Sequence, residues 1–266
     1  MRSCCATAGW TFSNGERPST FVLSSSLPPW LTAWLPTLPR TSPDYNELTP
    51  FYQIFEKSRF STETGAALVL SSNGTRVLSR LGFSFSRARG RKITAWDTLD
   101  GSTLANIGSL DLLGAEERFG APLMSVHRVD LHKELLQLAG TEDEGGEVVS
   151  GKEGSVKLRL NARVVSVDVM AGSVELADGE LQEADLVIAA DGVHSLLRDA
   201  VVGKDGTTKA ETTGLSAFRF LIPTEELKGD AGLRDFLKWK CMGPTILADT
   251  REMERERHMV WYDCQE

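Results

Sequence analysis

The chain has 266 residues, of which 41% are hydrophobic, and its 29 Lys and Arg against 37 Asp and Glu give a formal charge of −8. This is the composition of a globular protein long enough for one large domain or two small ones. The acidic balance argues against nucleic acid as a partner, because binding phosphates needs clustered Lys and Arg. No apolar run reaches the roughly 18 residues of a spanning helix, so we expect no transmembrane segment.

The first 50 residues differ from the rest of the chain. They hold seven of the ten prolines, six of them between positions 28 and 50. Each proline removes a backbone donor and disfavours helix in the residue before it. We therefore predict an irregular or disordered Pro-rich extension over residues 1–50. The alternative is that this stretch stands in place of a normal domain start.

Alternating strand and helix patterns begin at about residue 51. Residues 51–56 (FYQIFE) predict a short buried strand that ends in Glu56. An acid at the carboxyl end of a parallel strand can accept both hydroxyls of a nucleotide ribose, although such residues are often merely solvated. Residues 73–81 follow with an apolar helical face, and Gly82 is the predicted C-terminal stop.

The segment around Asp130 predicts a second helix. Asp130 is a suitable N-cap, leucines follow at helical spacing, and Gly140 ends the pattern. His127 and His132 lie close by, but a third ligand at suitable spacing is missing, so we predict no metal site. Arg128 is better interpreted as an anion or cofactor contact, or as a structural ion-pair partner.

A β-rich passage occupies residues 156–190. Residues 156–160 and 164–169 alternate with period two, and Asp178-Gly179 predicts a hairpin turn. Residues 185–190 (DLVIAA) form an apolar run typical of a strand buried on both faces.

Asp191 and Gly192 follow that apolar strand directly, and we predict a helix over residues 195–202. A strand, a tight glycine turn and a helix N-terminus would present a carboxylate and backbone N–H groups to one ligand. The alternative is a plain strand–turn–helix in which Asp191 bonds only local backbone.

Towards the end of the chain, residues 214–223 give the clearest strand pattern, with Arg219 on an otherwise apolar face. A charge in such a place favours a pocket-lining role, because burying it unpaired is costly. The four cysteines, at positions 4, 5, 241 and 264, match neither a zinc site nor a disulfide framework, which favours a reducing, cytoplasmic setting.

Together these segments resemble the flavin-dependent aromatic hydroxylases, the group of salicylate hydroxylase and para-hydroxybenzoate hydroxylase. The resemblance covers about residues 51–266 in collinear order. Its motifs are EKSRF (56–60), TGAAL (64–68), HRVDLH (127–132), ADGVHSLLR (190–198), SAFRFLIP (216–223) and MVWY (259–262).

The resemblance implies an α/β (overall α+β) fold. A partial Rossmann-like FAD-binding sheet with a β-meander would occupy residues 51–212, and the start of an antiparallel substrate-domain sheet would occupy residues 213–266. It further implies a monooxygenase that uses FAD, NAD(P)H and O2 to hydroxylate an aromatic or polyketide-like small molecule. Its implied cofactor contacts are Glu56 to the FAD ribose, Gly65 and Ala66 by backbone, Arg128 near the pyrophosphate or flavin, and Asp191 with Gly192 to the dinucleotide, while Arg219 would serve the catalytic pocket.

The chain departs from the family pattern at two places. The window expected to carry the GxGxxG turn, residues 24–38, contains no glycine, and Pro28 and Pro29 offer no N–H to a pyrophosphate. The sequence also stops at Glu266, before the family's second FAD-gripping "GD" segment. We therefore expect a fragment that binds FAD poorly and is inactive as written, with the central position of its sheet unfilled.

Two other interpretations stay open. One is a non-catalytic relative that binds a partner or a hydrophobic metabolite through the remaining sheet. The other is a different flavin oxidoreductase of the same architecture, such as a reductase or an epoxidase.

Overall fold

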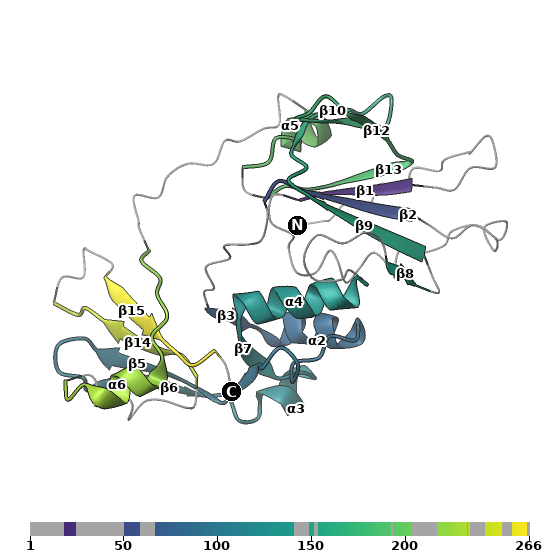
Figure 1. The fold of residues 1–266 in the computed structure, drawn as a ribbon. Coiled ribbons are helices and arrows are strands. Elements are labelled where there is room, and N and C mark those ends of the chain that lie inside the picture. Colours follow the sequence, from purple (N-terminus) through teal and green to yellow (C-terminus); the bar gives the residue numbers. More distant parts are fainter. Residues whose placement is uncertain are drawn as a thin grey trace.

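The computed structural model describes residues 51–58, 67–140, 156–192, 194–203, 217–232, 234, 243–251 and 257–264, and the backbone alone of residues 19–24, 149–151 and 154–155. Over these residues the chain has a mixed α/β fold whose strands form four small sheets (Figure 1). Among the described helices, none combines the length and the apolar character that crossing a bilayer requires.

The largest sheet has five strands and carries the first candidate residues. Its order is β13 (Leu186–Ala190), β1 (Ser19–Ser24), β2 (Phe51–Glu56), β9 (Gly154–Leu160) and β8 (Val149–Gly151). The first four are parallel, and their last residues stand in register as Ala190, Ser24, Glu56 and Leu160. Their carboxyl ends therefore share one edge of the sheet.

Strand β1 corrects the expectation of an irregular stretch over residues 1–50. Residues 19–24 (STFVLS) pair in parallel with both β13 and β2, so the centre of the sheet is filled rather than empty. The segment is rich in β-branched and aromatic residues and lies ahead of the proline cluster, which the average composition of the extension concealed. Residues 1–18 and 25–50 lie outside the described residues.

Side chains of β2 alternate between two buried clusters. Tyr52 and Ile54 pack on one face against Leu136 of α4 (Arg128–Leu138). Phe55 packs on the opposite face against Val174 and its neighbours in the meander. The period of two along β2 therefore places the sheet between a helix and a second sheet.

The meander is formed by β10 (Val164–Asp168), β11 (Ser173–Leu176) and β12 (Leu181–Glu183), paired antiparallel. Gly179, with φ of +86°, makes the β11–β12 turn, which confirms the predicted hairpin. The expectation that residues 185–190 are buried on both faces holds only in part. Ile188 and Val187 pack on the clusters of opposite faces, but Leu186 is 46% exposed and Ala189 is also exposed.

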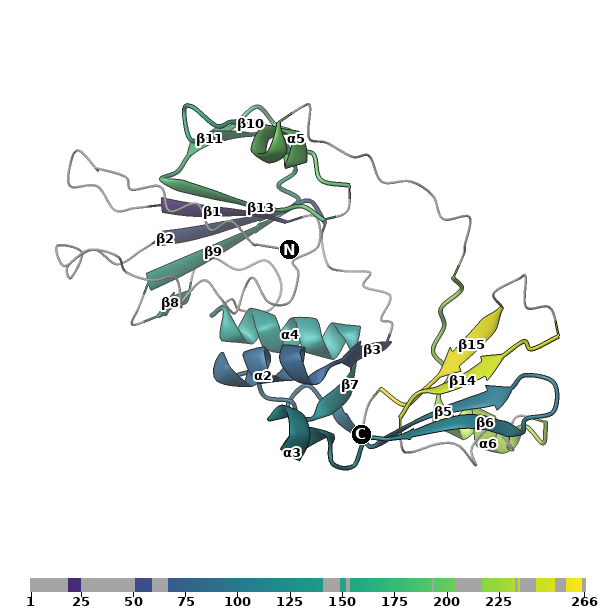
Figure 2. The ribbon, with the colours of Figure 1, turned by 180° about the vertical axis from the view of Figure 1, so that it is seen from behind.

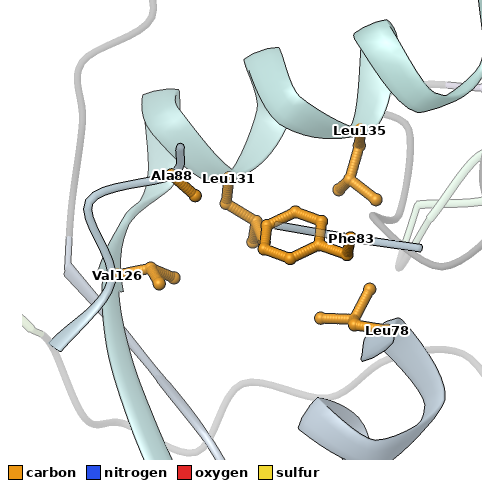
Figure 3. Close-up of a cluster of buried hydrophobic side chains, with 6 residues drawn as sticks. All are labelled: Leu78, Phe83, Ala88, Val126, Leu131 and Leu135. Atoms are coloured by element: carbon orange, nitrogen blue, oxygen red, sulfur yellow. The ribbon is translucent and has the colours of Figure 1, made fainter. Parts of the chain in front are cut away.

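A third sheet, with β3 (Ala67–Leu70), β7 (Leu123–His127) and β4 (Arg91–Ile93), is covered by α4 and by α2 (Ser72–Arg80). Figure 3 shows the ring of Phe83 between Leu131 and Leu135 of α4 and Leu78 of α2, in a cluster completed by Ala88 and Val126. The two helices predicted from apolar spacing are therefore confirmed, and α4 packs on two sheets at once.

Helix α4 begins earlier than predicted. Its N-cap is His127, and Asp130 lies inside the first turn, where its carboxylate pairs with Arg89 at 2.8 Å. The expectation that Asp130 caps the helix is wrong because the helix begins at Arg128, which makes Asp130 its third residue. Gly140, with φ of +74°, follows the end of the helix as expected.

The fourth sheet joins distant parts of the sequence in the order β15 (His258–Trp261), β14 (Thr245–Ala248), β5 (Ala95–Asp100) and β6 (Asn106–Asp111). Strands β14 and β5 are parallel, and the other pairs are antiparallel. The strand expected over residues 214–223 is wrong for residues 217–223, which form an irregular lead into α6 (Thr224–Gly229) with Phe218 92% exposed. Short helices α3 (Ala115–Phe119) and α5 (Arg198–Val202) complete the described elements.

Asp100 links β5 to β14 and should make stability depend on acidity. Its Oδ1 accepts hydrogen bonds from the hydroxyls and backbone N–H groups of Ser102 and Thr103, and its Oδ2 accepts one from the Thr250 hydroxyl. The Ser102 hydroxyl, followed by that of Thr250, holds the pKa of this carboxyl well below its usual range. The folded state lowers this pKa. The stabilisation that the Asp100 carboxylate contributes is therefore complete at pH values above its pKa in the unfolded chain, and it disappears as the pH falls through its pKa in the folded protein.

We expect Asp100→Asn to melt at a lower temperature than the unchanged protein at neutral pH. The gap should begin to narrow below about pH 3.9, the ordinary aspartate pKa, and should close only in stronger acid. Thermal melts of both proteins from neutral pH into acid measure this difference in melting temperature. Glu117→Gln, at an exposed position, is the control. A gap that stays constant down to the strongest acid that the fold survives would contradict the assignment.

Candidate functional site at the carboxyl edge of the five-stranded sheet

Glu56 is the most unusual polar residue of the sheet. It ends β2, and its side chain is fully buried, with 0% exposure. Its Oε1 accepts a hydrogen bond from the backbone N–H of Ser58 at 2.7 Å. Its buried Oε2 has no hydrogen-bond partner among the described residues. Burial of an unpaired carboxylate oxygen is costly, so this atom marks a place where a hydroxyl of a ligand would be stabilised.

The local backbone holds Glu56 in this position. The carbonyl oxygen of Glu56 accepts a hydrogen bond from Ala162 N–H at 2.9 Å, and Ser58 accepts one from Asn161 N–H at 3.3 Å. Strands β2 and β9 are thus tied together just beyond their paired ends. Ser58, which orients the carboxylate, was not identified from the sequence, although its position two residues after the acid is the visible signal.

Asp191 follows β13 at the same edge. Its Oδ1 accepts a hydrogen bond from the Ser195 hydroxyl at 2.6 Å, and its Oδ2 accepts from the backbone N–H groups of Leu196 at 2.7 Å and Leu197 at 3.2 Å. These are the local bonds of the plain strand–turn–helix alternative. Gly192, with φ of +81°, makes the tight turn that was predicted.

The local bonds of Asp191 also shorten the helix that was expected over residues 195–202. The chain at 195–197 turns around the carboxylate, and α5 begins only at Arg198. Gly203, with φ of +82°, ends the helix.

The two acids share one edge of the sheet, as their predicted roles require. The register aligns Glu56 with Ser24 of β1, and Ser24 with Ala190, the residue before Asp191. They therefore lie two strands apart, with the end of β1 between them.

Arg128 is the first residue of α4. The N-terminal end of this helix points in the same direction as the carboxyl ends of β2 and β9 in both views (Figures 1 and 2). The adjacent His127 has a buried Nδ1 without a hydrogen-bond partner among the described residues. Over the described part of the chain, no cluster of three or more His, Cys, Asp or Glu side chains could hold a metal ion.

Arg219 is not brought to this edge. It is exposed, in the segment that runs beside β15 into α6, apart from the five-stranded sheet in both views (Figures 1 and 2). Its charge acts on Tyr262: burial raises the pKa of that phenol, and Arg219 partly opposes the rise. The predicted residues Gly65 and Ala66 lie outside the described residues.

Comparison with known proteins gives a consistent group of relatives. No protein-family model matches the chain. It is 33% identical over 177 residues to the FAD-dependent monooxygenase phomE' of Diaporthe leptostromiformis, covering 66% of this chain and 43% of the relative. It is 34% identical over 222 residues to hispidin-3-hydroxylase of Neonothopanus nambi, and this match covers 80% of this chain and 49% of the relative. It is 34% identical over 177 residues to 3-amino-4-hydroxybenzoate 2-monooxygenase of Streptomyces cremeus, and this match covers 64% of this chain and 40% of the relative.

Among solved structures, the tetrameric form of 2-methyl-3-hydroxypyridine-5-carboxylic acid oxygenase superposes with a TM-score of 0.59 at 19% identity. The match covers 94% of this chain and 57% of that one. At this identity the likeness concerns the fold alone. The chain spans less than half of the length of the curated relatives described above.

Proposed function

Because the chain belongs to the FAD-dependent monooxygenase family, we propose that it takes up FAD at the carboxyl edge of the five-stranded sheet and hydroxylates an aromatic or polyketide-like small molecule. NAD(P)H and O2 would be the co-substrates. The names of the relatives support this proposal, since one specifies FAD and another an aminohydroxybenzoate substrate.

The buried Oε2 of Glu56 is the observation that carries the proposal. A ribose offers two adjacent hydroxyls, and a carboxylate at the end of a parallel strand can accept hydrogen bonds from them. Here one carboxylate oxygen is used by Ser58 N–H, while the other is buried without a described partner. This residue fits the adenosine ribose of FAD.

The remaining predicted residues take supporting roles in the proposal. Arg128 would contact the cofactor from the first turn of α4, and Gly65 with Ala66 would approach it by backbone. Gly192 would present its backbone, since the Asp191 carboxylate is already held by the turn that follows it. Arg219 would serve the substrate from the region of the fourth sheet. In such enzymes the flavin supplies the oxygen chemistry, and the protein supplies position, polarity and shielding from water.

Glu56→Gln tests the proposal through two opposite effects. The amide keeps an oxygen for Ser58 N–H but removes the buried carboxylate. The ligand-free protein should therefore gain about 1 kcal/mol of unfolding free energy or more and melt at a higher temperature. It also replaces an acceptor of a ribose hydroxyl by a donor. Loss of a hydrogen bond to a charged group, about 1.5–3 kcal/mol, should weaken FAD binding by about tenfold or more.

Equilibrium dialysis against FAD measures the affinity, and thermal melts without ligand measure the stability. The matched control is Glu183→Gln, an exposed glutamate on β12, which should change neither. If the unchanged protein melts cooperatively and FAD does not move the transition, a non-catalytic relative of the same fold is the better description.

A further inference from the structure

We propose that His127 is a further cofactor-binding residue, whose Nδ1 forms a hydrogen bond with the flavin half of FAD while Glu56 holds the adenosine half. In the sequence, His127 was considered only as a metal ligand and lacked sufficient partners for that role. This inference rests on the proposed function and adds a contact at the other end of the same ligand.

The imidazole of His127 contains an unpaired buried nitrogen. Its Nδ1 is buried and has no hydrogen-bond partner among the described residues. The residue as a whole is only partly buried, so the ring lies at the border between the interior and the surface. A buried nitrogen without a partner is costly, and an imidazole nitrogen donates or accepts a hydrogen bond according to its tautomer. A hydroxyl or carbonyl group of a bound ligand would satisfy it.

The side chain of His127 points away from the helix-covered core. His127 ends β7 in an extended conformation, with φ of −74° and ψ of 134°, so it faces the side of the sheet opposite to Val126. Figure 3 shows Val126 in the cluster with Leu131. His127 shares its own face with Ser125, whose hydroxyl donates to the carbonyl oxygen of Asp263 at 2.7 Å. This face therefore borders the segment that follows β15.

The position of His127 along α4 assigns it to the far half of the cofactor. Helix α4 packs through Leu136 against Ile54 of β2, and its N-terminal end points in the same direction as the carboxyl end of that strand (Figures 1 and 2). Arg128 lies about 12 Å along the helix from Leu136, whereas Glu56 lies about 7 Å along the strand from Ile54. The start of α4 therefore extends past the end of β2. A dinucleotide whose ribose is held by Glu56 would meet His127 with its other half, which in FAD is the flavin.

Two ligands that share only the adenosine half separate the roles of the two residues. Equilibrium dialysis of the full chain against FAD and against ADP gives both affinities for each variant. His127→Ala should weaken FAD binding about three- to tenfold, as expected for one hydrogen bond between uncharged groups, and leave ADP binding unchanged. Glu56→Gln should weaken FAD and ADP by the same factor, because both ligands carry the ribose.

The unchanged ADP affinity also shows that His127→Ala is folded. Its imidazole makes no side-chain cap of α4, so the ligand-free variant should melt close to the unchanged protein. The matched control is His258→Ala, at an exposed histidine of β15, which should change neither affinity.

Nuclear magnetic resonance of the unchanged protein gives a direct readout of the same contact. The chain contains 4 histidines, so isotope-labelled histidine gives few signals. The Nδ1 signal of His127, identified by its absence in His127→Gln, should shift when FAD is added and stay in place when ADP is added.

The outcomes separate this inference from the proposed function. An unchanged FAD affinity in His127→Ala, with Glu56→Gln weakening both ligands, would overturn this inference alone. Equal losses of FAD and ADP affinity in His127→Ala would also overturn it, because the residue would then not act on the flavin half. If neither ligand binds the unchanged protein, the proposed function fails together with it.

Discussion

Val22→Pro should strongly destabilise the five-stranded sheet. Val22 lies in the middle of β1, in register with Ile54 on one side and Ile188 on the other. Proline removes a ladder N–H, and its ring does not fit between two parallel neighbours, so the cost should be about 3 kcal/mol or more. Small domains have about 5–15 kcal/mol of stability in total, so this cost removes a large share of it and should lower the unfolding midpoint markedly.

Urea unfolding followed by far-ultraviolet circular dichroism measures this effect. Val22→Ala is the matched control because it also removes the branched side chain but keeps the N–H, so the difference between the variants reports backbone pairing alone. Equal midpoints for the two variants would show that residues 19–24 do not occupy the centre of the sheet. The expected order of stability is the unchanged protein, then Val22→Ala, then Val22→Pro.

Phe55→Ala should be the most damaging change of a single side chain on β2. Phe55 is 1% exposed and packs against the meander, and the guanidinium of Arg159 lies 5.5 Å from its ring centroid. Deleting a buried phenylalanine side chain costs about 3–5 kcal/mol, since both the transfer energy and the packing around the cavity are lost. Because Phe55 precedes Glu56, the loss should also lower FAD affinity by disordering the end of β2.

The same substitution at an exposed phenylalanine provides the control. Phe218 is 92% exposed, so Phe218→Ala should change the unfolding free energy by no more than about 0.5 kcal/mol. Chemical denaturation of both variants, analysed at equal slope, gives the comparison. Similar losses for the two would contradict the packing of β2 on the meander.

Much of the local structure could be predicted because it depends on neighbouring residues. The short buried strand of residues 51–56, the Asp-Gly turn of the meander and the leucine spacing of α4 each reflect interactions over a few positions. The errors concern where an element begins and whether a segment finds a pairing partner. Asp130 pairs with Arg89 and does not cap its helix, and residues 217–223 have strand propensity but are not paired in the sheet.

The pairing of strands into sheets was harder to predict from the sequence. Strands β5 and β6 come from the part of the chain assigned to the FAD-binding domain, yet they join β14 and β15 in one sheet. Pairing between strands more than 100 residues apart leaves no periodic signal in one sequence. The division into domains at residues 51–212 and 213–266 therefore stays a prediction.

The sequence by itself determined the family, the strand that ends in Glu56 and the acid–glycine turn at Asp191 and Gly192, because these depend on residue type and short spacing. Only the tertiary structure decided that β1 fills the centre of the sheet, that the Asp191 carboxylate is occupied by its own turn and that Oε2 of Glu56 is buried without a described partner. The physical reason is that strand register, and whether a polar atom finds a hydrogen-bond partner, depend on which residues come into contact in the folded chain. The spacing of residues along one sequence does not specify those contacts.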